Sequence, residues 1–530
     1  MLIIVIAFDL AIIFYRRRIK RRAALTGIAT SGQPSFIARF SFKPRPTLDK
    51  SLFVIALLVF LATRLIGLEK FPIYFFTDEA VNTVNAADFI DNGFRDPEGH
   101  LFPTYFQNDQ IRSLSVSVYI QVIPYLLFGY SIFVTRAASV LIALSAMFAL
   151  GLIFKKCFKL RYWWLGVFIL SVTPAWFLHT RTAFEAVLWV SFYVWFLYFY
   201  LQYRQGQLRN IFGALLTGAL SFYAYNGGQL GVVLTGSLLV LIDRKYHWQV
   251  LQRHRRMMLL ALSFGIILML PYLRFMSQFP LEISQHLRLL GSYWQPGVPF
   301  IDKLGGFARE YLFGLNPIYW YSTINDHDLI RHIMKGYGNS LWITLPLAVI
   351  GLIICLRKLR APEYRTILIA LIVSPVGGAL SDATVVHDLL FVIPAAVLTT
   401  IGAVKVLSLL QQRIAYPALA ISAAAILSVF NVLMLQDALS NGPTWYDNYG
   451  LYGLQYGGKE VFQAMNTYLQ QSPHIDFWVF PQTWLNGPDA IQRYFVPSGA
   501  NVSMFDFDDF LLQRYDVLPT DLLVVASDQY

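Results

Sequence analysis

The chain has 530 residues, of which 56% are hydrophobic and only 14% are charged, and its mean hydropathy is +0.51. An average soluble domain carries about 25% charged residues, so this composition excludes an ordinary soluble protein and indicates a polytopic membrane protein. The net charge of +11 would suggest nucleic-acid binding in a soluble protein, but most Lys and Arg residues here fall in short loops between apolar runs, where they set membrane orientation.

The N-terminal segment, 1–50, combines a short apolar run with a basic flank and a linker. Residues 2–15 are apolar, and a strongly basic stretch follows at 16–22. A secretory signal peptide carries its charges before the apolar core, so this order predicts a short membrane helix, tilted or incomplete, with a cytoplasmic flank. Residues 23–50, with scattered Gly, Ser and Pro, are expected to form a cytoplasmic linker.

Apolar runs of about 20 residues predict the spans of a helical membrane domain over residues 51–435. With the N-terminal run they predict about 11 to 12 transmembrane helices. The approximate spans are 51–68, 131–154, 162–178, 185–201, 210–224, 229–242, 257–273, 339–356, 366–380, 388–404 and 414–435.

Charge supports one orientation of these spans. If the stretch 16–22 is cytoplasmic, the inner loops include those near Lys155, Arg204, Arg244 and Arg357, whose basic character agrees with the positive-inside rule. The last inner loop is the exception, because it keeps only Lys405 and Arg413. The outer side then receives three longer segments, which are the first outer loop 69–130, the large outer loop 274–338 and the tail 436–530.

The tail 436–530 is predicted to be a small extracytoplasmic α/β domain. After a loop-rich start, a helix is expected at 459–471, a strand at 477–480 and a second helix at 488–495. Short apolar runs at 502–505 and 522–525 complete the pattern. Alternating helix and strand signals favour a partly parallel sheet.

An adjacent acidic pair, Asp78-Glu79, follows the first long apolar run and opens a predicted interfacial helix at 78–90. A partly desolvated carboxylate at this place can take a proton from an attacking hydroxyl. The alternative is structural, with Thr77 or Asp78 capping the helix and Glu79 adding favourable charge to its first turn. Adjacent helix residues point in different directions, so we expect one acid to be catalytic and the other to support it.

A second polar group, His179, Arg181 and Glu185, lies at the outer ends of two facing helices. Ionisable groups at this depth are costly unless they are paired or functional. The alternative is an Arg181–Glu185 helix pair that holds a tight hairpin.

Further polar side chains stand near other outer helix ends. Arg112 and Arg136 are lone arginines, which commonly extend to a lipid headgroup. Two further outer helix ends carry the polar side chains of Tyr223, Tyr225 and His387. Taken singly, each of these residues is more often used for packing or capping than for chemistry.

Together these elements resemble the polyprenyl-phosphate-sugar-dependent glycosyltransferases of the GT-C architecture. The similar group is the glycosyltransferase family 39-like one, which contains the protein O-mannosyltransferases and the lipid A aminoarabinose transferase. The matching elements are Asp78-Glu79, Phe128-Gly129 followed by Arg136, the hairpin from Pro174 through His179 and Arg181 to Glu185, and Ser221-x-Tyr223-x-Tyr225. The resemblance covers roughly residues 50–240 by motif and 241–435 by hydropathy.

The resemblance implies that Asp78 is the general base, that Glu79 is its neighbour in the site and that Arg136 binds the donor phosphate. Arg181 is added as a phosphate partner by position. Where relatives carry a Lys-Pro-Pro-Leu motif, this chain reads Gln-Asn-Asp-Gln-Ile-Arg at 107–112, which leaves Arg112 as the substitute. Asp388 stands where many relatives carry an arginine after the late histidine.

The predicted function is an inverting glycosyltransferase of a prokaryotic plasma membrane. It would move a hexose or pentose from a polyprenyl-phosphate donor to a protein, lipid or glycan acceptor at the outer face. One base with direct displacement predicts inversion, and arginines would stabilise the leaving phosphate. No nucleic-acid partner is expected, because the basic residues lie in short loops between apolar runs. No cofactor is expected either, because Cys and His do not show metal-ligand spacing; a divalent cation is the alternative.

A rival prediction is a lipid-linked sugar transporter or flippase, or a non-catalytic membrane scaffold. Transporters tend to show internal repeats and polar or broken helices near the bilayer midplane. In this sequence the charged motifs gather at one predicted face instead, which favours an interfacial enzyme.

Overall fold

The computed structural model describes residues 46–445 and 457–525, apart from 473, 482–484, 486, 498, 514 and 516. The predicted N-terminal helix at 2–15 lies outside the described residues. The last part of the predicted linker, from Pro46 on, is already helical, because α2 spans Pro46–Leu65.

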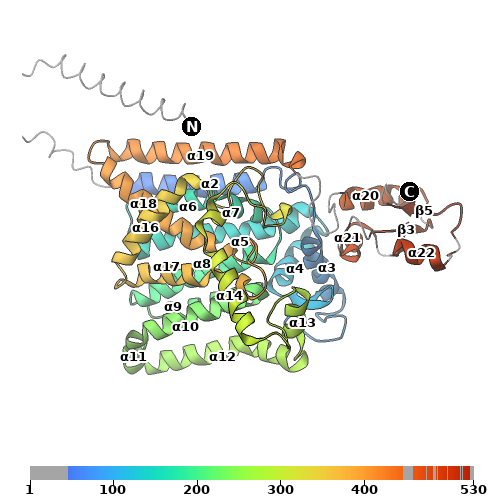
Figure 1. Cartoon of the computed structure of the whole chain (residues 1–530), viewed down its shortest axis with the longest axis horizontal. Helices are drawn as coiled ribbons and strands as arrows, with labels where there is room; N and C mark the ends of the chain where they lie inside the picture. The colour runs from blue at the N-terminus through green and yellow to red at the C-terminus, as the bar shows by residue number, and fades with distance from the viewer. Residues whose placement is uncertain are drawn as a thin grey trace, which may run out of the picture. The chain divides into compact units, whose positions relative to one another are not determined.

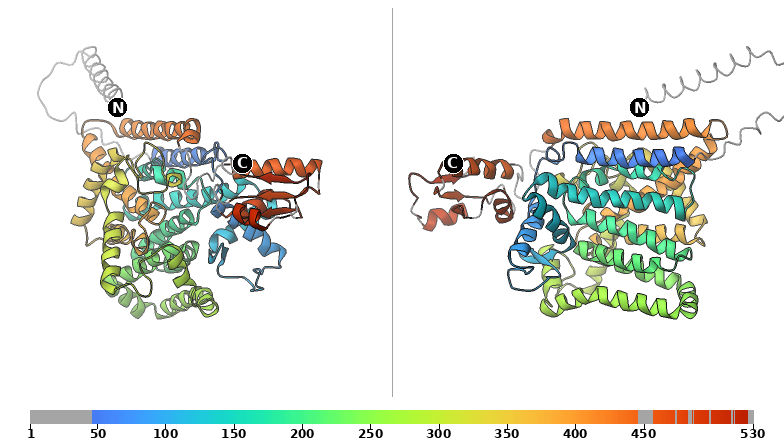
Figure 2. Two further views of the ribbon diagram at one scale, coloured as in Figure 1. Left: turned by 45° about the vertical axis from the view of Figure 1, so that its right-hand side comes forward. Right: turned by 180° about the vertical axis from the view of Figure 1, so that it is seen from behind.

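Apolar helices form a bundle in which most axes run side by side, with α19 beside α2 and α8 beside α9 (Figures 1 and 2). After α2, the helices of this bundle are α5 (Ile132–Leu152), α6 (Leu165–Ser171), α7 (Pro174–His179), α8 (Glu185–Arg204), α9 (Asn210–Ala224), α10 (Gln229–Ile242), α11 (Arg244–Arg253), α12 (Arg255–Gln278), α16 (Leu345–Arg357), α17 (Pro362–Val373), α18 (Val392–Leu410) and α19 (Tyr416–Ser440).

Within the described residues, six helices are long and apolar enough to cross a membrane. The pair Asn226–Ile242 and Arg244–Arg253, bent by 74°, raises this number to seven if it forms one span. The chain is therefore a polytopic membrane protein, as its composition predicted. The number of qualifying helices is smaller than the expected 11 to 12.

Short and broken helices account for most of the difference in number, and the charged residues at both ends of α2 keep that helix out of the set. Asn210–Ala224 and Trp342–Arg357 are apolar but shorter than a full span. The expected span 162–178 is divided into α6 and α7, because Pro174 pushes the residue before it into an extended conformation and ends the helix there.

Shorter elements gather at one end of the bundle, where α3, α4 and α13 lie (Figure 1). They come from the segments 69–130 and 274–338, which the sequence predicted to be outer loops. Their bounds are α3 (Thr77–Asp91), β1 (Phe106–Asn108), β2 (Ile111–Leu114), α4 (Val116–Phe128), α13 (Glu282–Leu289), α14 (Phe300–Gly314), α15 (Pro317–Tyr321) and the 3₁₀ turn η4 (Ile330–His332).

The C-terminal segment forms the predicted α/β unit around a three-stranded parallel sheet in the order β4-β3-β5. Its elements are α20 (Gly458–Gln471), β3 (Phe477–Val479), α21 (Pro488–Phe495), β4 (Val502–Met504), α22 (Phe507–Gln513) and β5 (Leu522–Val524). The buried core of this unit is continuous with side chains of α3 and α5, including Ala80, Val84 and Ile132. The unit therefore packs directly on the helix that begins with the acidic pair.

Candidate active site

The acidic pair lies in the first turn of α3, and its two members have different environments. Phe76 precedes the helix in an extended conformation, and the Glu79 carboxylate reaches back to accept the Phe76 backbone N–H at 3.4 Å. This contact satisfies one of the free donors at a helix N-terminus. Glu79 is fully buried, whereas Asp78 is only half-buried.

Glu79 forms a bidentate ion pair with Arg136, and both side chains are buried. Arg136 Nε donates to Oε2 and Nη2 to Oε1, each at 2.8 Å. The other guanidinium donors bond the carbonyl oxygens of Leu68, Pro72 and Tyr74 at 2.9, 3.0 and 2.5 Å. A guanidinium has five N–H donors, and these contacts engage all of them. The geometry favours a structural role for Arg136 over the predicted contact with the donor phosphate.

Arg181 is engaged in a similar way. Its guanidinium donates to the carbonyl oxygens of Thr63, Arg64, Ile66, Gly67 and Phe71 at 2.7 to 3.1 Å. These carbonyls belong to the last turn of α2 and the segment after it, where helix ends leave acceptors unsatisfied. The alternative pair with Glu185 is not formed among the described residues, and Arg181 instead terminates α2.

Asp78 lies among polar side chains from three other parts of the chain. Asn108 Nδ2 donates to its Oδ1 at 3.3 Å. The pKa of the Asp78 carboxyl is raised, mainly by burial and also by the negative charge of Glu79. The Asn108 hydrogen bond and the positive charge of Arg331 lower this pKa, but they do not cancel the rise. A carboxylate with increased proton affinity and partial exposure suits a general base.

A second carboxylate, Glu185, faces the same site from the start of α8. Asn82 Nδ2 lies 3.1 Å from Glu185 Oε1 and 2.7 Å from the Asp78 carbonyl oxygen, so it links the first turns of α3 and α8. Tyr225 lies close to both acids: burial raises the pKa of its phenol, and the charges of Glu185, Asp388 and Asp78 raise it further. The predicted residues Asp78, Glu185 and Tyr225 are therefore brought together.

Three histidines lie close to one another, beside Arg331 and Tyr225. The rings of His179 and His332 lie 5.6 Å apart, and His387 lies 6.5 Å from the ring of Tyr225. Burial lowers the pKa of His179 to about 4, and burial together with the charge of Arg331 lowers that of His332. His179 and His332 are therefore neutral at pH 7, so they serve as hydrogen-bonding groups and not as cations.

Two of the predicted site residues, Arg112 and Tyr223, make contacts away from Asp78. Arg112 forms ion pairs with Glu98 and, at 3.5 Å, with Glu282, which joins the first outer loop to α13. Tyr223 donates its hydroxyl to the Leu268 carbonyl at 2.7 Å and thereby joins α9 to α12. Both side chains stabilise the fold around the site.

Arg331 and Asn108 were missed by the sequence reasoning. Arg331 is 5% exposed, lies in η4 and places its guanidinium 4.4 Å from the centre of the Phe76 ring. Nothing near Arg331 in the sequence marks it, because its neighbour Asp78 belongs to the other outer loop. Asn108 lies inside the 107–112 stretch that departs from the family motif, so that departure was the available signal.

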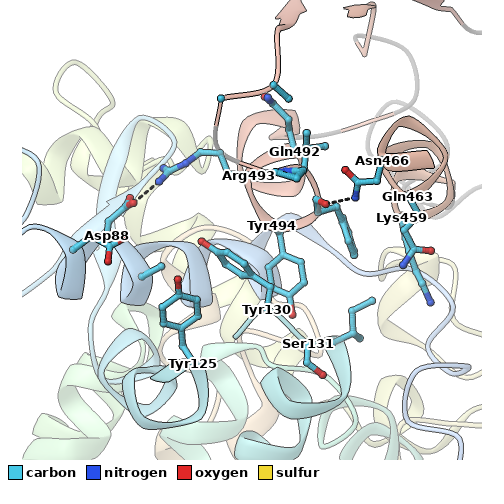
Figure 3. Close-up of a pocket in the computed structure, with 18 of the residues that line it drawn as sticks. Asp88, Tyr125, Tyr130, Ser131, Lys459, Gln463, Asn466, Gln492, Arg493 and Tyr494 are labelled. Atoms are coloured by element: carbon cyan, nitrogen blue, oxygen red, sulfur yellow. Dashed lines mark hydrogen bonds and ion pairs between the residues drawn. The ribbon is translucent and has the colours of Figure 1, made fainter. Parts of the chain in front are cut away.

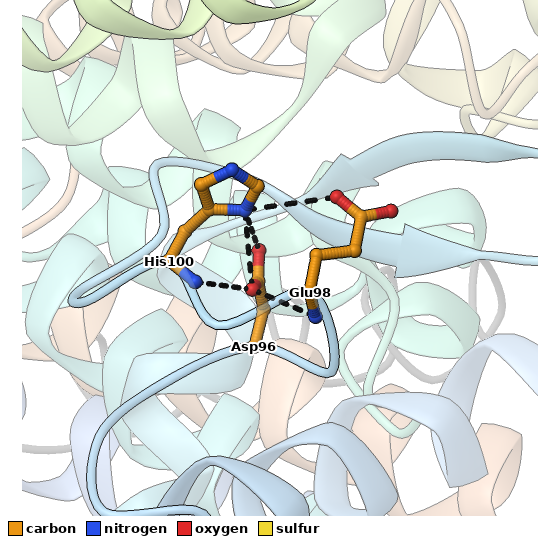
Figure 4. Close-up of side chains that lie close together, drawn as sticks. All are labelled: Asp96, Glu98 and His100. Carbon is orange, nitrogen blue, oxygen red and sulfur yellow. Dashed lines mark hydrogen bonds and ion pairs between the residues drawn. The ribbon is translucent and has the colours of Figure 1, made fainter.

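One group of three potential metal ligands occurs within the described residues, in the turn that contains Asp96, Glu98 and His100 (Figure 4). His100 Nδ1 lies 2.9 Å from Asp96 Oδ2 and 3.6 Å from Glu98 Oε2. Glu98 also pairs with Arg112. The contacts are those of an ion-paired turn in which the Asp96 carboxylate is largely buried and Glu98 is exposed, and the group is separate from the Asp78 site.

No protein-family model and no curated protein match the chain. Solved structures do match it. ArnT from Cupriavidus metallidurans in the apo state is 12% identical, with 90% of this chain and 89% of that chain covered and a TM-score of 0.52. The same protein bound to undecaprenyl phosphate is 16% identical, with 90% of each chain covered and a TM-score of 0.50. The chain thus has the fold of the GT-C membrane glycosyltransferases, as its motifs implied.

Proposed function

We propose that the chain is an inverting glycosyltransferase that uses a polyprenyl-phosphate sugar, with Asp78 as its general base. The observation that carries this proposal is the half-buried Asp78 carboxylate with a raised pKa, next to a buried arginine and opposite a second carboxylate. The GT-C fold supports the donor class, since the ArnT structure holds undecaprenyl phosphate.

In the proposed reaction the acceptor hydroxyl attacks the anomeric carbon of the sugar. The new C–O bond forms as the bond to the phosphate oxygen breaks, the hydroxyl proton passes to Asp78, and polyprenyl phosphate leaves with the bonding electrons. Direct displacement inverts the anomeric centre. Glu79 does not touch the reacting atoms in this scheme; it holds the first turn of α3 through Arg136.

We assign the leaving phosphate to Arg331 in place of Arg136 and Arg181. Its positive charge already acts on Asp78, and a guanidinium can stabilise a phosphate by charge-assisted hydrogen bonds. Glu185, Tyr225 and the neutral histidines supply hydrogen bonds to the sugar. The protein lies in a prokaryotic plasma membrane with this site on the outer face, and residues 51–435 and 436–530 are its catalytic and extracytoplasmic domains.

The test is reconstitution in liposomes with a labelled polyprenyl-phosphate sugar and a crude acceptor fraction. The wild-type chain should release free polyprenyl phosphate, and Asp78→Asn should lower this rate by at least about 100-fold, the usual contribution of a general base. The matched control is Asp302→Asn, an exposed acid on α14. Movement of the lipid across the bilayer without consumption would identify a flippase, and near-normal turnover by Asp78→Asn would reject the assignment of the base.

A further inference from the structure

A cavity of about 870 Å³ lies between the C-terminal unit and the first outer loop (Figure 3). Its walls come from α3, from the connection between α4 and α5, and from helices α20 and α21. It is separate from the Asp78 site: Asp88 lines the cavity, and ten residues of α3 separate it from Asp78, which corresponds to about 15 Å along a helix.

Contacts between α21 and the helices α3 and α5 hold the walls of this cavity together. Tyr494 of α21 is 4% exposed; its hydroxyl lies 3.0 Å from Thr135 Oγ1 of α5, and its ring lies 4.7 Å from that of Phe75. Asp88 of α3 pairs with Arg493 of α21 across the cavity rim (Figure 3). These contacts hold the two sides in register.

The lining combines aromatic faces with planar polar groups. Three tyrosine rings follow one another, with centroids 5.1 Å apart for Tyr125 and Tyr130 and 5.0 Å apart for Tyr130 and Tyr494. Gln463, Asn466 and Gln492, whose side chains end in amides, also line this space. Charges of both signs are present, with Glu69, Asp88 and Asp91 against Lys459 and Arg493.

This chemistry selects among ligand classes. A phosphate or nucleotide would call for an excess of cations, and a lipid tail would call for a mainly apolar lining. Amide and carboxylate groups can exchange hydrogen bonds with neighbouring hydroxyls, and the electron-rich face of a tyrosine attracts the polarised C–H groups of a sugar ring. The lining therefore fits a ligand rich in hydroxyl groups.

We propose that this pocket binds a saccharide. Resting on the proposed function, the saccharide belongs to a glycan acceptor, and the pocket holds a part of it that is remote from the attacking hydroxyl. Tyr130, which is 39% exposed, supplies the accessible ring face, and the exposed Gln463 on α20 supplies hydrogen bonds. Neither side chain belongs to the Asp78 site.

The test is binding of a panel of defined neutral and acidic oligosaccharides to the full chain in nanodiscs, measured by saturation-transfer NMR and calorimetry. The Asp78→Asn variant should bind as the wild type does. Tyr130→Ala should weaken binding at least about tenfold, whereas Tyr130→Phe keeps the ring and should stay near wild type. Tyr468→Ala, an exposed tyrosine of α20 outside the pocket, is the matched control.

The outcomes separate this inference from the proposed function. Saccharide binding without any sugar transfer would reject the enzyme and keep the pocket. Transfer to an acceptor without saccharide binding at millimolar concentration, or equal binding by Tyr130→Ala, would overturn the pocket alone. A third outcome is that only the acidic oligosaccharides bind, that Tyr130→Ala still binds them and that Arg493→Gln does not. This result would identify an anion site and would also overturn the saccharide pocket.

Discussion

At the scale of single residues, Asp78 and Glu79 show how position along one helical turn decides between chemistry and support. The buried Glu79 carboxylate accepts hydrogen bonds from the Arg136 guanidinium and from the backbone N–H groups of Phe76 and Ala183. Asp78 points toward Asn108 and remains half-buried. The sequence predicted that the two acids would differ, because neighbouring helix residues face different directions.

The raised pKa of Asp78 has a consequence for stability. An acid whose pKa is higher in the folded state than in the unfolded state opposes folding once pH rises above its unfolded pKa, here near 3.8. Asp78→Asn removes this charge and keeps an oxygen that can accept from Asn108. We expect it to abolish turnover while its melting temperature at pH 7 equals or exceeds that of the wild type. A clear loss of melting temperature would contradict this account.

Arg331 should also control the pH dependence of the reaction. Its charge lowers the pKa of Asp78, so removing the charge should move the acidic limb of the kcat/KM profile to higher pH. We expect this shift, with a higher KM for the lipid donor, in Arg331→Gln and partial recovery in Arg331→Lys. A fall in kcat with an unmoved profile would point to a packing role only.

The buried pair of Glu79 and Arg136 should instead govern stability. Breaking a buried pair leaves one charge uncompensated and costs about 3–5 kcal/mol. We expect Arg136→Gln to lower the melting temperature strongly in detergent. Arg136→Lys should fail to rescue it, because an ammonium has three donors in place of five. A variant that keeps the wild-type melting temperature but loses donor binding would restore the phosphate role predicted from the family resemblance.

At the scale of elements, the strongest sequence patterns gave the most accurate predictions. The interfacial helix expected at 78–90 is α3, Thr77–Asp91. The tail elements expected at 459–471, 477–480 and 488–495 are α20, β3 and α21. α20 begins at Gly458 and α21 at Pro488, and the polar residues of α3 recur every three or four positions, so local signals are sufficient to define these helices.

Elements that depend on distant contacts were not predicted. The β1–β2 hairpin and α13 are short, with strands of three and four residues and a helix of eight, and the segment 274–338 that contains η4 reaches Asp78 only in the folded chain. The hydrogen-bond partners of Arg136 and Arg181 were not predicted for the same reason. A sequence shows that an arginine lies near a helix end, but not that five backbone or carboxylate oxygens converge on it.

Arg181 should stabilise the end of α2, because it donates hydrogen bonds to the carbonyl oxygens of its last turn and of the segment after it. Each buried carbonyl left without a donor costs about 1–3 kcal/mol. We expect Arg181→Gln to lower the melting temperature, and hydrogen exchange to increase at residues 63–71. Arg161→Gln, at an exposed arginine, is the control. Unchanged exchange in 63–71 would show that α2 does not need this cap.

At the scale of the whole molecule, the C-terminal unit packs on the helix that carries Asp78, the proposed base. Phe75, Ala80 and Val84 beside the base share a core with Phe462 and Ile491 of the tail. We expect a chain truncated after residue 445 to insert in the membrane but to lose activity, because this apolar face of α3 becomes exposed. Limited proteolysis near residues 75–91 would report the loosened helix. Full turnover by the truncated chain would show that α3 is held without the tail.

Because α3 is unbroken from Thr77 to Asp91, it fixes the distance between the two sites along it. A helix keeps a constant rise of about 1.5 Å per residue, so the proposed base at one end and the saccharide pocket farther along cannot approach each other. Acceptors too short to bridge this gap would occupy only one position at a time. Turnover should therefore rise in a step as the acceptor is lengthened, and the position of that step is set by the length of helix between Asp78 and Asp88.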